Sequence, residues 1–383
     1  MDFTITAEQD ELRRVVRAFL ARHSGEAEVR AAMATEDGYD PAVWRRMSDE
    51  LGLPGLAIPE KYGGSGFGAV ELGIAFEEAG RALLCAPFLS TTGLAAQVLL
   101  AGDDEDARAD LLPGIAAGTT LATVAVTGDG TWRPIGHGAP RARETHEGWA
   151  LDGRVTCVLD GASADVVLVV ADAPGGLGLF AVPSTAPGLT RRVLPTLDQT
   201  RKQGALSFAG TPGQVVAAPG SASAVLRRGL AAAAALLAAE QVGVAAAALD
   251  AAVGYATVRV QYGRPIGTFQ GVKHKCADML VLLEAARSAA YAGLWALQSG
   301  DDDEVEVASS VAQVVCSQAL VQVAGDSLQV HGGIGFTWEH PAHLYLKRAK
   351  SSELLLGTPA QHREILARRL AGVPSPAAGG APR

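Results

Sequence analysis

The stretch RVQYGRPIGTFQ, residues 259–270, lies inside the part of the chain that decides the fold. It separates two long helical patterns, and two further helical patterns follow it. The four helices are expected at about residues 222–261, 272–299, 304–330 and 359–370. Helices of these lengths suit an antiparallel arrangement. The sequence therefore predicts a C-terminal four-helix bundle over residues 217–372.

Length, charge and cysteine spacing restrict the class of protein. The chain has 383 residues, which is enough for two or three core units. Its net charge of −9 and the absence of any lysine- or arginine-rich run argue against nucleic-acid binding. The four cysteines are widely spaced, so no metal site is expected, and reduced thiols favour a cytoplasmic location.

One apolar stretch, residues 229–254, is long enough to suggest a membrane span. It contains Glu240, Gln241 and Asp250, which would be costly in lipid. Its abundant alanine adds little transfer free energy. A buried helix is therefore predicted here, with no membrane partner.

The first third of the chain, residues 1–118, has helical patterns. Thr6 and Gln9 have the spacing of a capping box, and Asp40 precedes Pro41 as a second helix start that ends near Gly52. The glycine-rich loop at 59–66 precedes another helix. These signals predict an N-terminal helical domain.

The middle of the chain, residues 119–216, has a different period. Short apolar or alternating runs are punctuated by turn-forming pairs, which is typical of antiparallel hairpins. The expected strands cover residues 121–127, 149–151, 154–159, 166–171 and 177–182. We predict an antiparallel β-barrel or sandwich here, so the fold class is α+β. The tail, residues 373–383, has little to bury and is expected to be disordered.

Two motifs, residues 259–270 and QVHGGIGF at residues 329–336, resemble the acyl-CoA dehydrogenase family. Weaker matches occur in the family's order at Pro59–Gly64, at Glu78–Gly80 and at Thr200–Arg201. The resemblance runs over nearly the whole chain. It implies the domain order given above and an FAD-dependent oxidation of an acyl-CoA thioester between its α and β carbons.

The resemblance also implies which residues contact FAD. In the family, such residues reach a cofactor that half belongs to the neighbouring subunit. An arginine such as Arg259 neutralises pyrophosphate, and glycines such as Gly332 and Gly333 allow the backbone to approach closely. The implied cofactor-binding set is Arg259, Phe269, Gln270, Gln329, Val330, Gly332 and Gly333. Lys273, His274 and His331 are expected to be structural.

The catalytic base of the family is missing from both of its usual positions. One position precedes a Gly-Thr pair and is Leu356 here; the alternative position on the long helix is Ala233. Neither side chain can accept a proton. The nearest carboxylates by sequence are Glu240 and Glu353, for which we expect structural or solvated roles. No catalytic residue is therefore predicted in this chain.

The β domain departs from the family pattern as well. Cys157 stands where a tryptophan is usual and Leu159 where a hydroxyl residue is usual, and the turn at 126–130 has lost its typical residues. Residues that serve a partner's FAD are thus retained, whereas those that serve the chain's own flavin are lost.

This pattern resembles the base-lacking subunit of actinobacterial heterotetrameric, steroid-type acyl-CoA dehydrogenases. The resemblance implies a second dehydrogenase-like partner chain, an α2β2 assembly, and acyl-CoA, possibly with a steroid side chain as its acyl group, bound mainly by that partner. Three alternatives remain open: a homomeric dehydrogenase with an unrecognised base, a flavin-free scaffold protein, and an oxidase or monooxygenase of the same fold.

Overall fold

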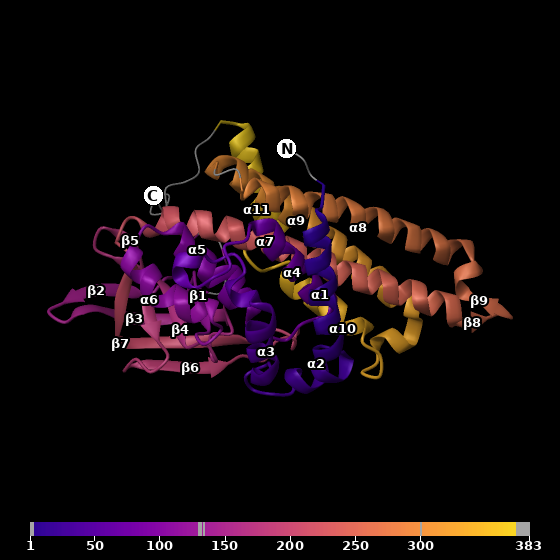
Figure 1. Ribbon diagram of the computed structural model, residues 1–383, viewed down its shortest axis with the longest axis horizontal. Coiled ribbons are helices and arrows are strands. Elements are labelled where there is room, and N and C mark those ends of the chain that lie inside the picture. Colours follow the sequence, from indigo (N-terminus) through magenta and orange to yellow (C-terminus); the bar gives the residue numbers. More distant parts are fainter. Residues whose placement is uncertain (1–3, 129–131, 133–134, 299–300, 373–383) are drawn as a thin grey trace.

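The computed structural model describes residues 4–128, 132, 135–298 and 301–372. The chain forms a helical N-terminal region, a middle β region and a C-terminal helical region (Figure 1). This confirms the α+β fold class. The tail at 373–383 and the residues Asp129 and Gly130 of the turn at 126–130 lie outside the described residues.

The N-terminal region starts with the predicted caps. Thr6 and Gln9 form a capping box at the start of α1, and the Asp40 carboxylate accepts a 2.8 Å hydrogen bond from the Ala42 amide at the start of α3. Gly52 ends α3 in the left-handed conformation, with φ of 61°. The helices are α1 (Ala7–His23), α2 (Glu26–Met33), α3 (Pro41–Leu51), α4 (Ala69–Arg81), α5 (Ala96–Ala101) and α6 (Glu105–Ala116), with a π-helical segment at Leu89–Ala95 before α5.

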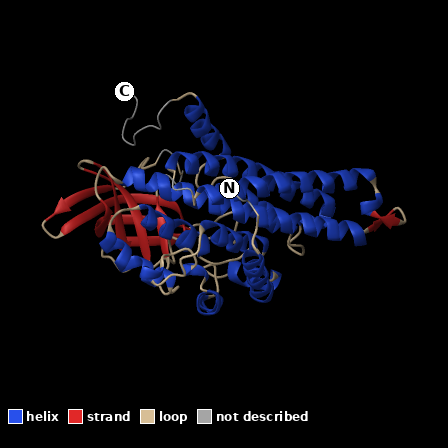
Figure 2. Ribbon diagram, turned by 45° about the horizontal axis from the view of Figure 1, so that its top comes forward, coloured by secondary structure: helices blue, strands red, loops and turns tan. Residues whose placement is uncertain are grey.

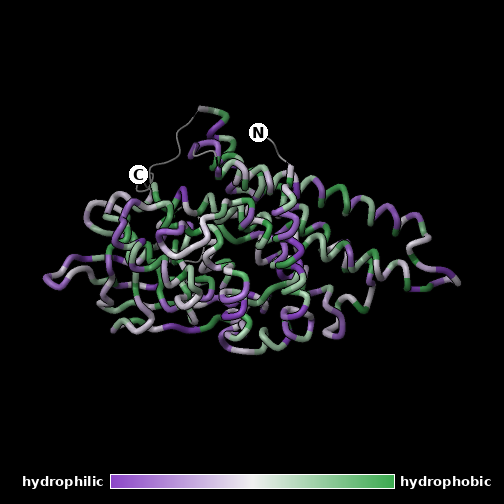
Figure 3. The backbone as a smooth tube through the Cα atoms, viewed as in Figure 1, coloured by the Kyte–Doolittle hydropathy of each residue, from purple (hydrophilic) through white to green (hydrophobic). Residues whose placement is uncertain are grey.

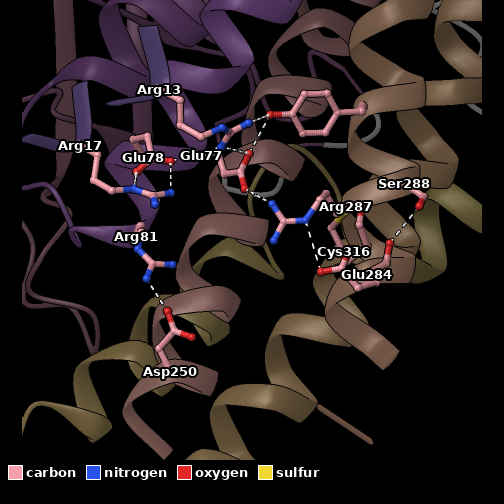
Figure 4. A network of polar contacts seen from close by, with 12 residues as sticks. Arg13, Arg17, Glu77, Glu78, Arg81, Asp250, Glu284, Arg287, Ser288 and Cys316 are labelled. Atoms are coloured by element: carbon pink, nitrogen blue, oxygen red, sulfur yellow. Dashed lines mark hydrogen bonds and ion pairs between the residues drawn. The ribbon is translucent and has the colours of Figure 1, made fainter. Parts of the chain in front are cut away.

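A buried ionic network holds α1 against the rest of the protein (Figure 4). Arg13 donates to the Glu77 carboxylate at 2.7 Å, and Arg17 donates to Glu78 at 2.7 Å. The Tyr291 hydroxyl, on helix α8, donates to the same Glu77 carboxylate at 2.7 Å. Glu77 and Glu78 are almost fully buried, so α1 supplies the charges that make their burial on α4 tolerable.

The middle region is a seven-stranded sheet that closes on itself. Its strands are β1 (Ala122–Ala125), β2 (Arg141–Thr145), β3 (Gly148–Leu159), β4 (Val166–Ala173), β5 (Gly176–Pro183), β6 (Leu189–Val193) and β7 (Gln203–Ala217). The pairings run from β4 through β2, β3, β7 and β5 back to β4, with β1 added on β4 and β6 added on β7. The enclosed apolar side chains form a separate core.

Two details of the β prediction are wrong. The sheet is mixed rather than antiparallel, because β1 and β2 both run parallel to β4. Asp152 and Gly153 do not form a turn between two strands; they lie inside β3, where the register with β7 shifts and Gly153 has φ of 141°. A glycine in a strand can mark a bulge as readily as a turn, and only the strand partner distinguishes the two.

The C-terminal region has three long helices that run away from the sheet (Figure 2), followed by two shorter helices. The helices are α7 (Ala222–Val258), α8 (Gln270–Ala296), α9 (Asp302–His331), α10 (Ala342–Ser352) and α11 (Pro359–Leu370). The two-residue strands β8 (Val260–Gln261) and β9 (Arg264–Pro265) pair in the hairpin between α7 and α8 at the far end of the bundle. A short 3-10 segment, η5 (Gly332–Phe336), follows α9.

Helix α7 is the central element of the molecule. Two helical stretches, Ala222–Val258 and Asp302–Phe336, are long and apolar enough to cross a membrane by length and composition alone, and the apolar window of the first is wholly buried in the protein. In Figure 3, hydrophobic residues, in green, recur along the long helices. The prediction of a buried helix at 229–254 is therefore confirmed.

Small residues bring α4 and α7 into close contact. A Cβ atom at Gly243 would lie 1.7 Å from the Glu77 carbonyl oxygen, and one at Gly80 would lie 2.1 Å from the Glu240 carbonyl oxygen. Only glycine permits this approach. The close crossing fixes where α7 presents Ala233 and Glu240.

Candidate functional site

Both expected positions of the catalytic base are buried in one apolar cluster. Ala233 on α7 is 0% exposed and Leu356 after α10 is 2% exposed. The cluster also contains Phe76, Leu237 and Leu355. Neither position has a carboxylate, and a carboxylate introduced at either one would enter a hydrophobic core.

The backbone around Leu356 is held in place by two side chains. The Gln313 amide donates to the Leu355 carbonyl oxygen at 3.1 Å, and a ring nitrogen of His362 lies 3.2 Å from the Leu356 carbonyl oxygen. Leu356 itself has a left-handed backbone, with φ of 59°. A Leu in this conformation is uncommon and is retained because the surrounding contacts fix it.

Glu240 is the centre of a buried arginine cluster, which we define as Asp198, Arg201, Glu240 and Arg348. Arg348 donates to one Glu240 oxygen at 2.6 Å, and Arg201 donates to the same oxygen. Burial alone would raise the pKa of Glu240, but the two guanidinium groups outweigh burial and hold this pKa below its ordinary value. Glu240 is thus a fixed anion with two cationic partners rather than a proton acceptor.

Arg348 also joins the three regions of the chain. Its Nε donates to the Thr200 hydroxyl at 2.8 Å and lies 3.4 Å from the Asp198 carboxylate. Its Nη2 donates to the carbonyl oxygen of Leu84, which follows α4, at 3.2 Å. The arginine cluster therefore connects the N-terminal helices, the β region and the bundle.

A third carboxyl group, Asp160, lies beside the arginine cluster. Its Oδ2 accepts a 2.6 Å hydrogen bond from the Ser90 hydroxyl. Burial raises the pKa of Asp160 to about 6, while the Ser90 hydrogen bond and the two arginines oppose this rise. Two arginines already balance Glu240 and Asp198, so an ionised Asp160 adds an unmatched negative charge.

The space at this junction is too small for a substrate. A cavity lined by Phe76, Asp160, Arg201, Glu240 and Arg348 has a volume of about 20 Å³. Such a cavity holds about one water molecule, whereas ligand pockets typically have volumes of about 300 Å³ or more.

Glu353 lies at the surface and is no better placed as a base. Its carboxylate pairs with Lys350 at 3.1 Å, one helical turn away, and its side chain is 30% exposed. Glu353 is thus paired with Lys350 near the surface, whereas Glu240 is paired with Arg201 and Arg348 in the interior.

The residues implied in cofactor binding gather at the opposite end of the bundle. Arg259 ends α7, Gln270 begins α8 and Gln329 lies in the last turn of α9. Two contacts bring these ends together: the rings of Tyr255 and His331 have centroids 4.7 Å apart, and Lys275 pairs with Asp326.

Three polar side chains of the implied set are exposed at this end and lack partners among the described residues. Arg259, Gln270 and Gln329 are exposed, and none of their side chains forms a hydrogen bond or ion pair with residues 4–128, 132, 135–298 or 301–372. Gly332 has φ of 64°, and a Cβ atom at Gly332 or Gly333 would meet no atom within 4 Å. The turn is therefore open to a ligand from outside the chain.

Two members of the implied set differ from the others. The Val330 side chain is 8% exposed and packs in the bundle core, so only its backbone could reach a cofactor. Phe269 is half-buried, with the Arg264 guanidinium 4.2 Å from its ring centroid. The motif alone predicts neither the burial of the Val330 side chain nor the packing of Arg264 on Phe269.

The sequence reasoning missed Arg201 and Arg348 as partners of Glu240. A signal existed, because a glutamate inside an alanine-rich buried helix requires a cationic partner. The sequence could not identify that partner, since Arg348 is 108 residues from Glu240 along the chain.

Comparison with known proteins agrees with this architecture. Residues 6–119 match the family model for the acyl-CoA dehydrogenase N-terminal domain, and residues 223–371 match that for the acyl-CoA dehydrogenase C-terminal domain. The acyl-CoA dehydrogenase IpdE2 of Mycobacterium tuberculosis is 36% identical over 361 residues, which cover 94% of this chain and 96% of that protein.

Solved structures show the same likeness. A chain of a Tcur3481-Tcur3483 steroid ACAD variant has a TM-score of 0.86 at 32% identity, covering 96% of this chain and 99% of that one. A chain of the ChsE4-ChsE5 complex from Mycobacterium tuberculosis has a TM-score of 0.88 at 28% identity, covering 98% of this chain and 100% of that one. With matches to both family domains and to full-length relatives, this chain belongs to the acyl-CoA dehydrogenase family, whose fold is FAD-dependent.

Proposed function

We propose that this chain is the base-lacking subunit of a heteromeric FAD-dependent acyl-CoA dehydrogenase and that it completes the FAD site of a second, dehydrogenase-like chain. The observation that carries the proposal is the contrast between its two candidate sites. Ala233 and Leu356 lie in a closed apolar core, whereas Arg259, Gln270 and Gln329 are exposed and without partners in the described chain.

The open end of the bundle fits part of an FAD molecule. The Arg259 guanidinium can form charge-assisted hydrogen bonds with a pyrophosphate, and the amide side chains of Gln270 and Gln329 can donate and accept hydrogen bonds. The open turn at Gly332 and Gly333 lets the backbone approach a phosphate or a ribose. Bound FAD would accept the hydride that leaves the β carbon of the acyl group.

Proton removal must then come from the partner. The reaction needs a carboxylate aimed at the α carbon of the thioester, and neither expected position supplies one here. Glu240 is bound by Arg201 and Arg348, and Glu353 pairs with Lys350 at the surface. These contacts disfavour a homomer that uses either glutamate as its base.

Exposed apolar side chains around the open end favour a protein neighbour. Tyr262 is 93% exposed, Val258 73%, Phe336 68% and Trp338 56%. They belong to the end of α7, the β8–β9 hairpin and the segment after α9. Large apolar side chains grouped in this way are typical of surfaces that contact another protein.

The names of the similar structures support the same assignment. The ChsE4-ChsE5 complex and the Tcur3481-Tcur3483 protein each pair two chains, and the second of these is a steroid ACAD. We extend this to an α2β2 assembly for the present chain, with a steroid-type acyl-CoA bound mainly by the partner.

Co-expression tests the proposal directly. The chain is produced alone and together with a candidate dehydrogenase-like partner chain from the same organism, and flavin absorbance and oligomer mass are recorded for each preparation. We expect flavin and a tetramer only with the partner. A chain that binds flavin and oxidises acyl-CoA by itself would overturn the proposal, and a colourless complex would indicate a flavin-free scaffold.

A further inference from the structure

Three aromatic rings meet directly behind the open glycine turn. Tyr255 comes from α7, His331 is the last residue of α9, and His340 comes from the loop before α10. The ring centroids of His331 and His340 are 4.4 Å apart, and those of His331 and Tyr255 are 4.7 Å apart. We call these three residues the ring stack.

The ring stack is tied to the turn through His331. His331 is 3% exposed and immediately precedes Gly332. A Cβ atom at Gly335 would lie 3.1 Å from the His331 Cβ, so η5 folds back over this side chain. The His331 side chain is therefore packed against the Gly332–Phe336 segment.

The hydrogen bonds of the two histidines fix which nitrogen carries a proton. The Nδ1 of His331 lies 2.7 Å from the Ser327 carbonyl oxygen, which can only accept, so this Nδ1 is protonated. The Nδ1 of His340 lies 3.2 Å from the Ala342 amide, which can only donate, so this Nδ1 is unprotonated. Both contacts are satisfied by two neutral rings.

We propose that His331 and His340 are positioning residues, which hold the Gly332–Phe336 turn in the conformation presented to the partner's FAD as long as the His340 ring is neutral. This inference rests on the proposed function for its link to FAD. The stack itself is a feature of this chain and can be tested separately.

Protonation of the His340 ring would weaken the stack, because its Nδ1 could then no longer accept the hydrogen bond from the Ala342 amide. Burial lowers the pKa of His340, and His331 lowers it further. Because a lowered pKa favours the neutral form in the folded state, the docked stack is stable above the ordinary histidine pKa of about 6.5 and weakens as the pH falls below it.

The surrounding charges do not remove this effect. On α2, Glu26 favours a protonated His340, but its carboxylate is paired with Arg30 at 2.8 Å. Arg30 itself disfavours a protonated His340. On α10, His343 is also close enough to interact with His340, and burial lowers the pKa of His343, which favours its neutral form.

Hydrogen exchange of the full-length chain tests the ring stack without any need for FAD. Amide exchange in residues 332–336, corrected for the intrinsic pH effect, is measured at about pH 8 and about pH 5.5. We expect roughly tenfold weaker protection at the lower pH in the natural chain. We expect no such change in His340→Phe, which keeps a ring but cannot be protonated. The exposed His146→Phe is the matched control and should behave as the natural chain does.

A second arm uses the complex with its partner. His340→Ala should lose FAD more readily than the natural chain at about pH 8, and His340→Phe should restore retention. The proposal that the ring stack positions the Gly332–Phe336 turn would be overturned by either of two results: unchanged protection in the natural chain on acidification, or an equal change in His340→Phe. If protection changes as expected while FAD retention does not, the ring stack stands and the link of this turn to FAD, part of the proposed function, fails.

Discussion

The junction around Glu240 and the far end of the bundle are opposites in the same chain. At the junction, charged groups are buried and paired, and the cavity beside them is about 20 Å³. At the far end, Arg259, Gln270 and Gln329 are exposed and unpaired among the described residues, and the Gly332 turn is open. The charged groups of the first region have their partners within the chain, whereas the polar groups of the second region have none until a ligand binds.

This difference distinguishes a lost site from a retained one. Paired charges and close packing contribute to folding free energy and require no ligand. Exposed donors around an open turn contribute little to the free energy of folding, so their expected contribution is to ligand binding. The two regions should therefore respond differently to substitution: the first in stability, the second in flavin retention.

The largest effect is expected when the arginine cluster loses its central anion. Glu240→Gln leaves Arg201 and Arg348 buried without their shared carboxylate, and removal of one partner from a buried ion pair costs about 3–5 kcal/mol. Urea unfolding measures this free energy. The surface variant Glu353→Gln, which removes the Lys350 pair, should change the unfolding free energy by about 1 kcal/mol or less. Equal effects of the two variants would contradict the contrast between buried and exposed pairs.

A glycine substitution in each region sharpens the same comparison. Gly243→Ala places a Cβ atom 1.7 Å from the Glu77 carbonyl oxygen, so α4 and α7 must separate, which costs about 1–3 kcal/mol. Gly333→Ala meets open space and should change the unfolding free energy by about 0.5 kcal/mol or less. Thermal unfolding of both variants provides the test, and a strongly destabilised Gly333→Ala would show that the turn is not open.

Arg259→Ala probes the open end in the complex. Removing one charge-assisted contact to a pyrophosphate should weaken FAD binding about 10- to 100-fold, with unfolding of the chain unchanged. Flavin fluorescence on dilution of the complex measures the release. Arg192→Ala, at an exposed arginine of β6, is the control. Identical retention in the two variants would remove Arg259 from the FAD site.

The last effect concerns Asp160 and appears only when the pH is raised. Because the folded pKa of about 6 lies above the ordinary value of 3.8, the stability contributed by the neutral carboxyl is present below about pH 4 and is lost as the pH rises through 6. Asp160→Asn should therefore match the natural chain near pH 4 and exceed its stability by up to about 3 kcal/mol at pH 8, which is the free-energy equivalent of the pKa shift. Urea unfolding at both pH values checks this. A less stable variant at pH 8 would mean that the arginines need a third carboxylate.

Much of the fold followed from local signals. The caps at Thr6 and Asp40 were predicted because capping depends on neighbouring residues. The helix at 359–370 was also predicted, and its ends are those of α11. Strand β7 escaped prediction as a 15-residue strand because its glycines and proline have the composition of loops. Its conformation is maintained by pairing with β3, β5 and β6, which local composition does not encode.

The candidate site was predictable to a different extent at each end. Loss of the base could be read from the residue types at Ala233 and Leu356. The reason that Glu240 cannot replace the base required tertiary structure, since Arg201 and Arg348 come from distant segments. Burial of Val330 likewise depends on how α9 packs.

Flavin content of the purified heteromeric complex is the most direct test of the central claim. If this chain completes its partner's site and holds none of its own, the complex will contain one FAD for each pair of the two chains. Two FAD molecules per pair would contradict the account, because the closed junction of this chain would then have to bind a flavin.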